Sequence, residues 1–124
     1  MVKDKGKTYD LEERLLEYTV RIIKIVEQLP RTRIGNHVAG QLLKSGTSPF
    51  PNHGEAQAAE SPKDFIHKLR ISLKELRETQ RWLRLISRVP LIKKPELLID
   101  ILQETEELIK IFAKSIKTAE KKQK

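Results

Sequence analysis

Apolar residues recur along this 124-residue chain at steps of three and four, the spacing that places them on one face of an α-helix. The first such stretch is predicted to begin near Asp10, where Glu13 completes a capping-box-like pair, and to end before Pro30. Its apolar face consists of Leu11, Leu15, Tyr18, Ile22, Ile25 and Leu29. The pattern therefore predicts an amphipathic helix with one buried face.

Two longer helices are predicted in the second half of the chain. Ser61, Pro62 and Asp64 suit an N-cap, a first helical position and an acidic first turn, and Val89-Pro90 ends this helix. Its expected core stripe is Phe65, Leu69, Leu73, Leu76 and Leu83. The last helix is predicted to begin at Lys94-Pro95-Glu96. Its apolar face is marked by Leu98, Leu102, Leu108, Phe112 and Ile116.

The segment between the first helix and the helix that starts at Ser61 has a different character. From about Arg33 it is rich in small residues, which allow a neighbouring helix to come close, although each Gly costs about 1 kcal/mol in a helix interior. These residues are Gly35, Ala39, Gly40, Ser45 and Gly46. Pro49 and Pro51 then remove two backbone donors, which predicts a kink or a break in this second helix.

No stretch of the sequence alternates with a period of two, so strands are not expected. Long helical stretches joined by short connections favour an all-α fold, an antiparallel up-and-down four-helix bundle. We expect residues 1–9 to form a flexible basic N-terminus, residues 10–117 the bundle, and residues 118–124 a lysine-rich tail.

Composition narrows the possible functions. The chain has no cysteine, which excludes disulfides, thiolate nucleophiles and cysteine zinc sites. No apolar run approaches the roughly 20 residues that span a bilayer, so no membrane association is expected. The lysine-rich start has no apolar segment after it, so no secretory signal is expected and the cytoplasm is the expected location.

Catalytic and metal chemistry have little support in the sequence. His37, His53 and His67 are not spaced at i+3 or i+4, so a metal site on a helix is not predicted. Ser48, Asn52 and Glu55 are predicted to form a small polar cluster whose role is to satisfy backbone groups that the prolines free. Phosphate loops and hydrolase motifs are absent from the sequence. We therefore expect no enzymatic activity, no cofactor, no metal and no small-molecule substrate.

Charge changes this picture, because the formal net charge is +8. Six basic residues step by four, three, four, three and four along the third helix, and they fall within about 80° of one another. This basic line consists of Arg70, Lys74, Arg77, Arg81, Arg84 and Arg88. It predicts either a surface that binds a nucleic-acid backbone or a face paired with acids of a neighbouring helix or subunit. The candidate acids are Glu12, Glu13, Glu17, Glu27, Glu104, Glu106 and Glu107.

The third helix carries a second apolar face roughly opposite its leucines. Ile71, Trp82 and Leu85 fall together there, with Glu75 and Glu78 beside them. A bundle helix needs only one buried face, so this second one predicts contact with another copy of the chain. The alternative is that Trp82 covers a loop of its own chain.

The central part of the sequence resembles the bacterial four-helix-bundle family, also called 23S ribosomal RNA intervening-sequence proteins or the S23 family. The resemblance covers roughly residues 11–112 and is densest over 41–86. It rests on residues 41–49 (QLLKSGTSP), 51–52 (PN), 55–56 (EA), 59–61 (AES), 64–69 (DFIHKL), 73–78 (LKELRE) and 82–83 (WL).

The resemblance implies a four-helix bundle that assembles as a ring-like homopentamer, with structural roles for the signature positions Ser48, Asn52 and Glu55. A distant branch of the family is the accessory variability determinant of diversity-generating retroelements, which associates with RNA and a reverse transcriptase. The expected function is therefore a basic accessory protein that binds structured RNA or a ribonucleoprotein such as a reverse transcriptase complex. The alternative is an oligomeric protein-interaction scaffold that binds no nucleic acid.

Overall fold

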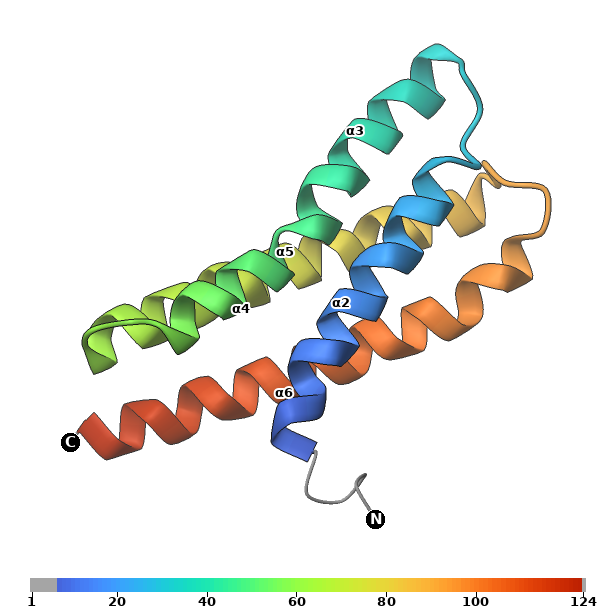
Figure 1. Ribbon diagram of the computed structural model, residues 1–124. Coiled ribbons are helices and arrows are strands. Elements are labelled where there is room, and N and C mark those ends of the chain that lie inside the picture. The colour runs from blue at the N-terminus through green and yellow to red at the C-terminus, as the bar shows by residue number, and fades with distance from the viewer. Residues whose placement is uncertain (1–6, 124) are drawn as a thin grey trace.

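The chain folds into four helical segments that pack side by side (Figure 1). The computed structural model describes the backbone of residues 7–123 and the side chains of residues 11–123. The elements are α2 (Lys7–Val26), α3 (Arg33–Thr47), α4 (Pro49–Gln57), α5 (Pro62–Arg88), the 3-10 turn η1 (Pro95–Leu97) and α6 (Leu98–Gln123). Because α3 and α4 together form one helical segment, the four segments run up, down, up and down. The all-α four-helix bundle is confirmed.

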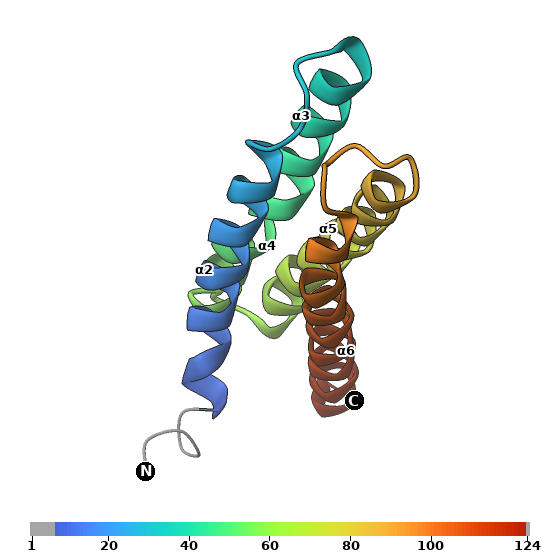
Figure 2. The ribbon, with the colours of Figure 1, turned by 90° about the vertical axis from the view of Figure 1, so that its right-hand side faces the viewer.

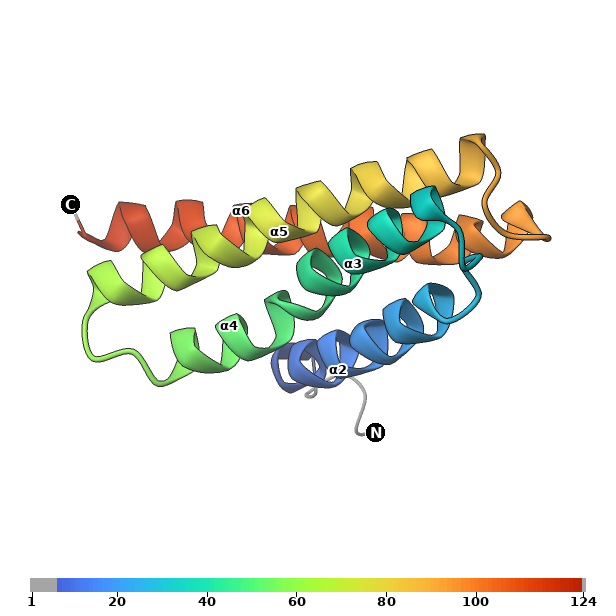
Figure 3. The same cartoon turned by 90° about the horizontal axis from the view of Figure 1, so that it is seen from above.

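The second helix is bent at its prolines and not broken. Ser48 joins α3 to α4 with φ −72° and ψ −38°, which is right-handed helical backbone. Pro49 and Pro51 lie in the first turn of α4, where a missing N–H leaves no helical hydrogen bond unmade. Figure 3 shows α4 continuing from α3 at a changed angle. The two prolines thus change the direction of the helix without ending the helical course.

Helix ends agree with the sequence in part. Ser61 caps α5 as predicted, because its hydroxyl accepts a hydrogen bond from the backbone N–H of Asp64 at 3.1 Å. The first helix begins three residues before its predicted start near Asp10: α2 begins at Lys7, so Asp10 lies inside its first turn. At the other end α6 continues to Gln123, so residues 118–123 of the predicted tail are helical. Residues 1–6 of the predicted flexible N-terminus lie outside the described residues.

The core stripe of α5 is displaced from the predicted one. Phe65 and Leu73 are only half-buried. The buried line of this helix is Ile66, Leu69, Ser72, Leu76, Thr79, Leu83 and Ile86. Two of its members are polar, and each hydroxyl bonds to a carbonyl oxygen one turn earlier, Ser72 to Lys68 and Thr79 to Glu75. These polar residues can be buried because each hydroxyl is hydrogen-bonded within its own helix. A sequence pattern that counts only apolar residues therefore misses them.

Two of the small residues of α3, Gly46 and Ser45, face α2 and α5, whereas Gly40 is exposed. A methyl group on Gly46 would lie 2.7 Å from Cγ2 of Ile22 on α2. Ser45, on the neighbouring side of α3, is fully buried and accepts a hydrogen bond from the Thr79 hydroxyl at 2.9 Å. The sequence prediction that this segment lets a neighbouring helix come close is confirmed.

Candidate nucleic-acid interface

The basic line of α5 lies on the outside of the bundle. All six side chains are exposed. The reason is local: the buried line of α5 faces α3, α4 and α6, and the basic residues sit on a different side of the same helix. From Arg70 to Arg88 the line is about 27 Å long at 1.5 Å per residue.

One member of the line is paired within the chain. The Arg70 guanidinium forms an ion pair with the Glu120 carboxylate on α6. For the other five members, no salt bridge forms with any carboxylate of residues 11–123. Sequence reasoning missed Glu120 because it placed this residue in a tail.

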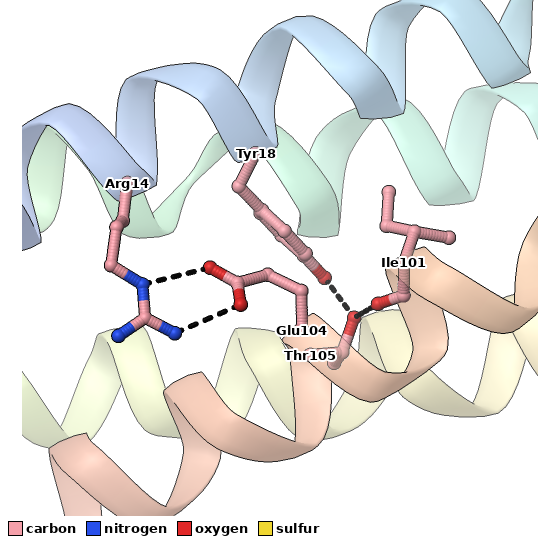
Figure 4. A network of polar contacts seen from close by, with 5 residues as sticks. All are labelled: Arg14, Tyr18, Ile101, Glu104 and Thr105. Atoms are coloured by element: carbon pink, nitrogen blue, oxygen red, sulfur yellow. Dashed lines mark hydrogen bonds and ion pairs between the residues drawn. The ribbon is translucent and has the colours of Figure 1, made fainter.

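The acids of α6 that were candidate partners of the line are engaged elsewhere or exposed. Glu104 accepts two hydrogen bonds from Arg14 of α2, from Nε at 3.0 Å and from Nη2 at 2.8 Å (Figure 4). Glu106 accepts one from the Gln80 amide at 2.7 Å. Pairing inside the chain therefore does not account for the arginines in the C-terminal half of α5.

A shallow hollow lies at that end of the line. It has a volume of about 300 Å³ and is lined by Arg81, Arg84, Leu85 and Arg88. Each of the three arginines that line the hollow carries a planar fork of N–H donors, a geometry that matches phosphate oxygens. Sequence spacing placed these arginines on one face, but the hollow itself became visible only in the structure.

The second apolar face of α5 is partly covered by its own chain. The ring of Trp82 meets His37 of α3 edge-on, with ring centroids 6.0 Å apart, and its Nε1 donates to a Glu78 carboxylate oxygen at 3.3 Å. Leu85 remains exposed and Ile71 is half-buried. Partial burial, followed by the nearby Glu78 charge, raises the pKa of Glu75. The apolar surface left for another copy is smaller than the sequence indicates.

The predicted polar cluster is divided by the structure. The Asn52 amide donates to the Ser48 hydroxyl at 2.9 Å and to the Ser48 carbonyl oxygen at 3.1 Å, so these two residues meet at the bend. Glu55 points elsewhere and accepts a hydrogen bond from Lys68 of α5 at 2.6 Å, which raises the pKa of that lysine. Ser48 and Asn52 are thus brought together, whereas Glu55 ties α4 to α5.

Two polar groups lie deep in the bundle. Tyr18 of α2 donates its hydroxyl proton to Thr105 of α6 at 2.6 Å, because Thr105 uses its own proton on the Ile101 carbonyl oxygen at 2.7 Å (Figure 4). Burial raises the pKa of Tyr18. His53 of α4 is buried against Phe112, and burial lowers its pKa. Both groups are therefore neutral near pH 7 and belong to the core.

A family model matches most of this sequence. The model of the 23S rRNA-intervening sequence protein matches residues 7–114, which is most of the chain. The chain belongs to this family. Family membership confirms the resemblance that the central sequence segments carry.

Another family member has a solved structure with the same fold. It is a protein of unknown function from the S23 ribosomal protein family of Bacteroides thetaiotaomicron, and it is 37% identical to the present chain. The similarity covers 86% of this chain and 97% of that one, with a TM-score of 0.78. Among curated proteins, none matches the chain.

Two further features concern the described residues of the present chain. No helix within residues 7–123 is long and apolar enough to cross a membrane. Within residues 11–123, whose side chains the structure describes, no group of three or more His, Asp or Glu residues is placed to hold a metal ion.

Proposed function

We propose that this family member is a non-enzymatic, homo-oligomeric bundle, a pentamer by resemblance, that binds structured RNA or a ribonucleoprotein as an accessory protein. The observation that carries the proposal is the exposed basic line of α5, five of whose six members form no salt bridge within residues 11–123. The name of the family, which refers to 23S rRNA, and the net charge of +8 support the same interpretation.

The contact would be made with phosphates and not with bases. Arginines on a straight helix can follow a phosphate backbone, but α5 offers no aromatic side chain within the line on which a base could stack. Binding of this kind is weakly sequence-specific and falls steeply as salt concentration rises, because phosphate contacts release counterions. The hollow between Arg81, Arg84 and Arg88 is the strongest single anchor for a phosphate.

The test is fluorescence anisotropy of a labelled structured RNA over a salt series. We compare wild type with a variant in which Arg77, Arg81 and Arg84 are changed to Gln. We expect the variant to bind more weakly and its slope of log K against log salt to be shallower, by up to about one per lost contact.

A matched control removes the same charge from another surface. Lys24, Arg31 and Arg33 are exposed and lie outside α5, on α2, on the turn after it and at the start of α3, and changing all three to Gln lowers the net charge equally. We expect this control to bind nearly as wild type does. If wild type does not bind RNA, or if both triple variants lose the same affinity, the basic line is not a specific contact surface. The interaction scaffold that binds no nucleic acid would then be the better account.

A further inference from the structure

A groove opens where α2 leaves α6. The two helices meet at Arg14–Glu104 and Tyr18–Thr105, and the last turns of α6 extend beyond this crossing (Figures 1 and 2). The groove there has a volume of about 830 Å³. Phe65, Ile111 and Ala119 are among the apolar side chains that line it. This end of the bundle core is therefore left without a covering helix.

The rim of this groove is basic. Lys114 and Lys122 border it along one side of α6. Small side chains at Ser115 and Ala119, one turn apart along the groove, would let the backbone of another helix come close. From Ile111 to Lys122 the groove follows about 17 Å of helix. Its shape and charge fit an amphipathic helix with an apolar stripe and acidic flanks.

Such a helix exists in this chain, on the outer face of α2. Leu16, Val20 and Ile23 are 40%, 38% and 40% exposed and follow one another at i, i+4 and i+7. We call these three residues the α2 ridge. Exposed glutamates surround it at Glu12, Glu13, Glu17 and Glu27, and they outnumber the basic neighbours, the exposed Lys24 and the half-buried Arg21. The ridge is about 10 Å long, so it fits within the length of the groove.

A single copy does not bring its own ridge to its own groove. Tyr18 faces α6, and at 100° per residue Leu16 points about 160° away from Tyr18 around α2. The ridge and the groove therefore lie on different sides of the molecule. A contact between two copies can bring the ridge of one copy onto the groove of the other.

We propose that the α2 ridge of one copy docks in the α5–α6 groove of the next copy, with the ridge glutamates beside the groove lysines. The proposal rests on the self-association included in the proposed function, and it places the contact on α2 and α6 and not on the Trp82 face of α5. Ridge and groove are different surfaces, so the contact is head-to-tail. Repetition of such a contact gives a closed ring if the rotation between copies closes, and an open chain otherwise.

Light scattering on the full chain tests the contact. Val20→Asp places a charge in the ridge, and Ser115→Trp fills the groove; both positions lie away from the core, and circular dichroism checks that the helices remain. We expect each variant to fall from the wild-type oligomer mass toward the 14.4 kDa of one copy. The matched control is Ile99→Asp, at a side chain that is 62% exposed and belongs to neither surface, and it should keep the wild-type mass.

Cysteine pairing tests the head-to-tail direction, since the chain has no cysteine of its own. Val20→Cys and Ser115→Cys proteins are oxidised separately and as an equal mixture. We expect covalent dimers in the mixture only, and none when Ile99→Cys replaces Val20→Cys. Cross-linking of Val20→Cys with itself would overturn the proposal, because it would mean that two ridges meet.

The remaining outcomes separate the two proposals. If the wild type is an oligomer but Val20→Asp and Ser115→Trp both keep its mass, the ridge and groove are not the interface. Loss of mass in Leu85→Asp would then place the interface on α5, and self-association would stand. If the wild type is a single copy at all concentrations, this inference and the homo-oligomer both fail. RNA binding through the arginines is decided by the anisotropy series in either case.

Discussion

Among its contacts within the chain, helix α2 packs against α3 and against α6 in opposite ways. Its contact with α3 is close because two glycines of α3 have no side chain. Gly46 leaves room for Ile22 of α2, and Gly35 leaves room for Pro30 in the turn that follows α2. Against α6 it packs through polar partners, with Arg14 on Glu104 and the Tyr18 hydroxyl on Thr105. One helix is thus held by shape on one side and by hydrogen bonds on the other.

The two contacts should respond differently to mutation. A close-packed contact has no room, so one added methyl group forces backbone or core side chains to move. A hydrogen-bonded contact loses only a modest net free energy when one partner is removed cleanly, and more when a buried polar atom is left without a partner. The glycine side should therefore be the more sensitive to a small change.

Gly35→Ala should give the largest effect. The added Cβ would overlap the backbone carbonyl oxygen of Pro30 and lie 2.9 Å from Pro30 Cγ, and the backbone cannot move aside without opening the α2–α3 turn. We expect a loss of about 3 kcal/mol or more in the free energy of unfolding, measured by urea denaturation at fixed protein concentration.

Gly40→Ala is the matched control on the same helix. A Cβ at Gly40 meets no atom within 4 Å, so the substitution should stabilise the protein by up to about 1 kcal/mol through helix propensity. Equal changes in stability at Gly35 and Gly40 would contradict the idea that close packing holds this side of α2.

Gly46→Ala should have a smaller effect than Gly35→Ala, because the obstacle is a side chain. The new methyl group would lie 2.7 Å from Ile22 Cγ2 and 3.1 Å from Cγ1. We expect a net loss of roughly 1–2 kcal/mol, since strain is partly offset by helix propensity. In an Ile22→Ala background the same substitution should cost nothing, and a double-mutant cycle in urea measures this coupling. If the cost persisted in that background, the strain would lie elsewhere.

Much of the fold could be predicted from periodicity alone. The spacing of apolar residues gives four helical courses, and the Ser61–Asp64 cap was predicted to the residue. The register of the core was less predictable. Ser72, Thr79 and Thr105 are polar, yet they are fully buried because each hydroxyl bonds to its own helix. A pattern that counts only apolar residues omits these positions, and for this reason the predicted core stripe of α5 differs from the buried line.

The candidate site was predictable in composition but not in pairing. The steps of four and three placed the basic line on one exposed face, as the structure shows. Which acids would meet it depended on helix lengths: Glu120 reaches Arg70 only because α6 continues to Gln123. The groove beside α6 depends on where α2 crosses, and no local pattern encodes a crossing point.

The polar side of α2 gives the finest test, because its two partners should not be equivalent. Tyr18→Phe removes a donor and leaves Thr105 still bonded to the Ile101 carbonyl oxygen, so the expected loss is about 1 kcal/mol. Thr105→Val leaves the buried Tyr18 hydroxyl without its partner, and that desolvated group should cost about 1–3 kcal/mol. Urea denaturation of both variants and of the double variant measures the difference. A greater loss from Tyr18→Phe than from Thr105→Val would reverse this assignment of donor and acceptor. A small loss in both, beside a large one at Gly35, would show that shape fixes the position of α2 and that hydrogen bonds only refine it.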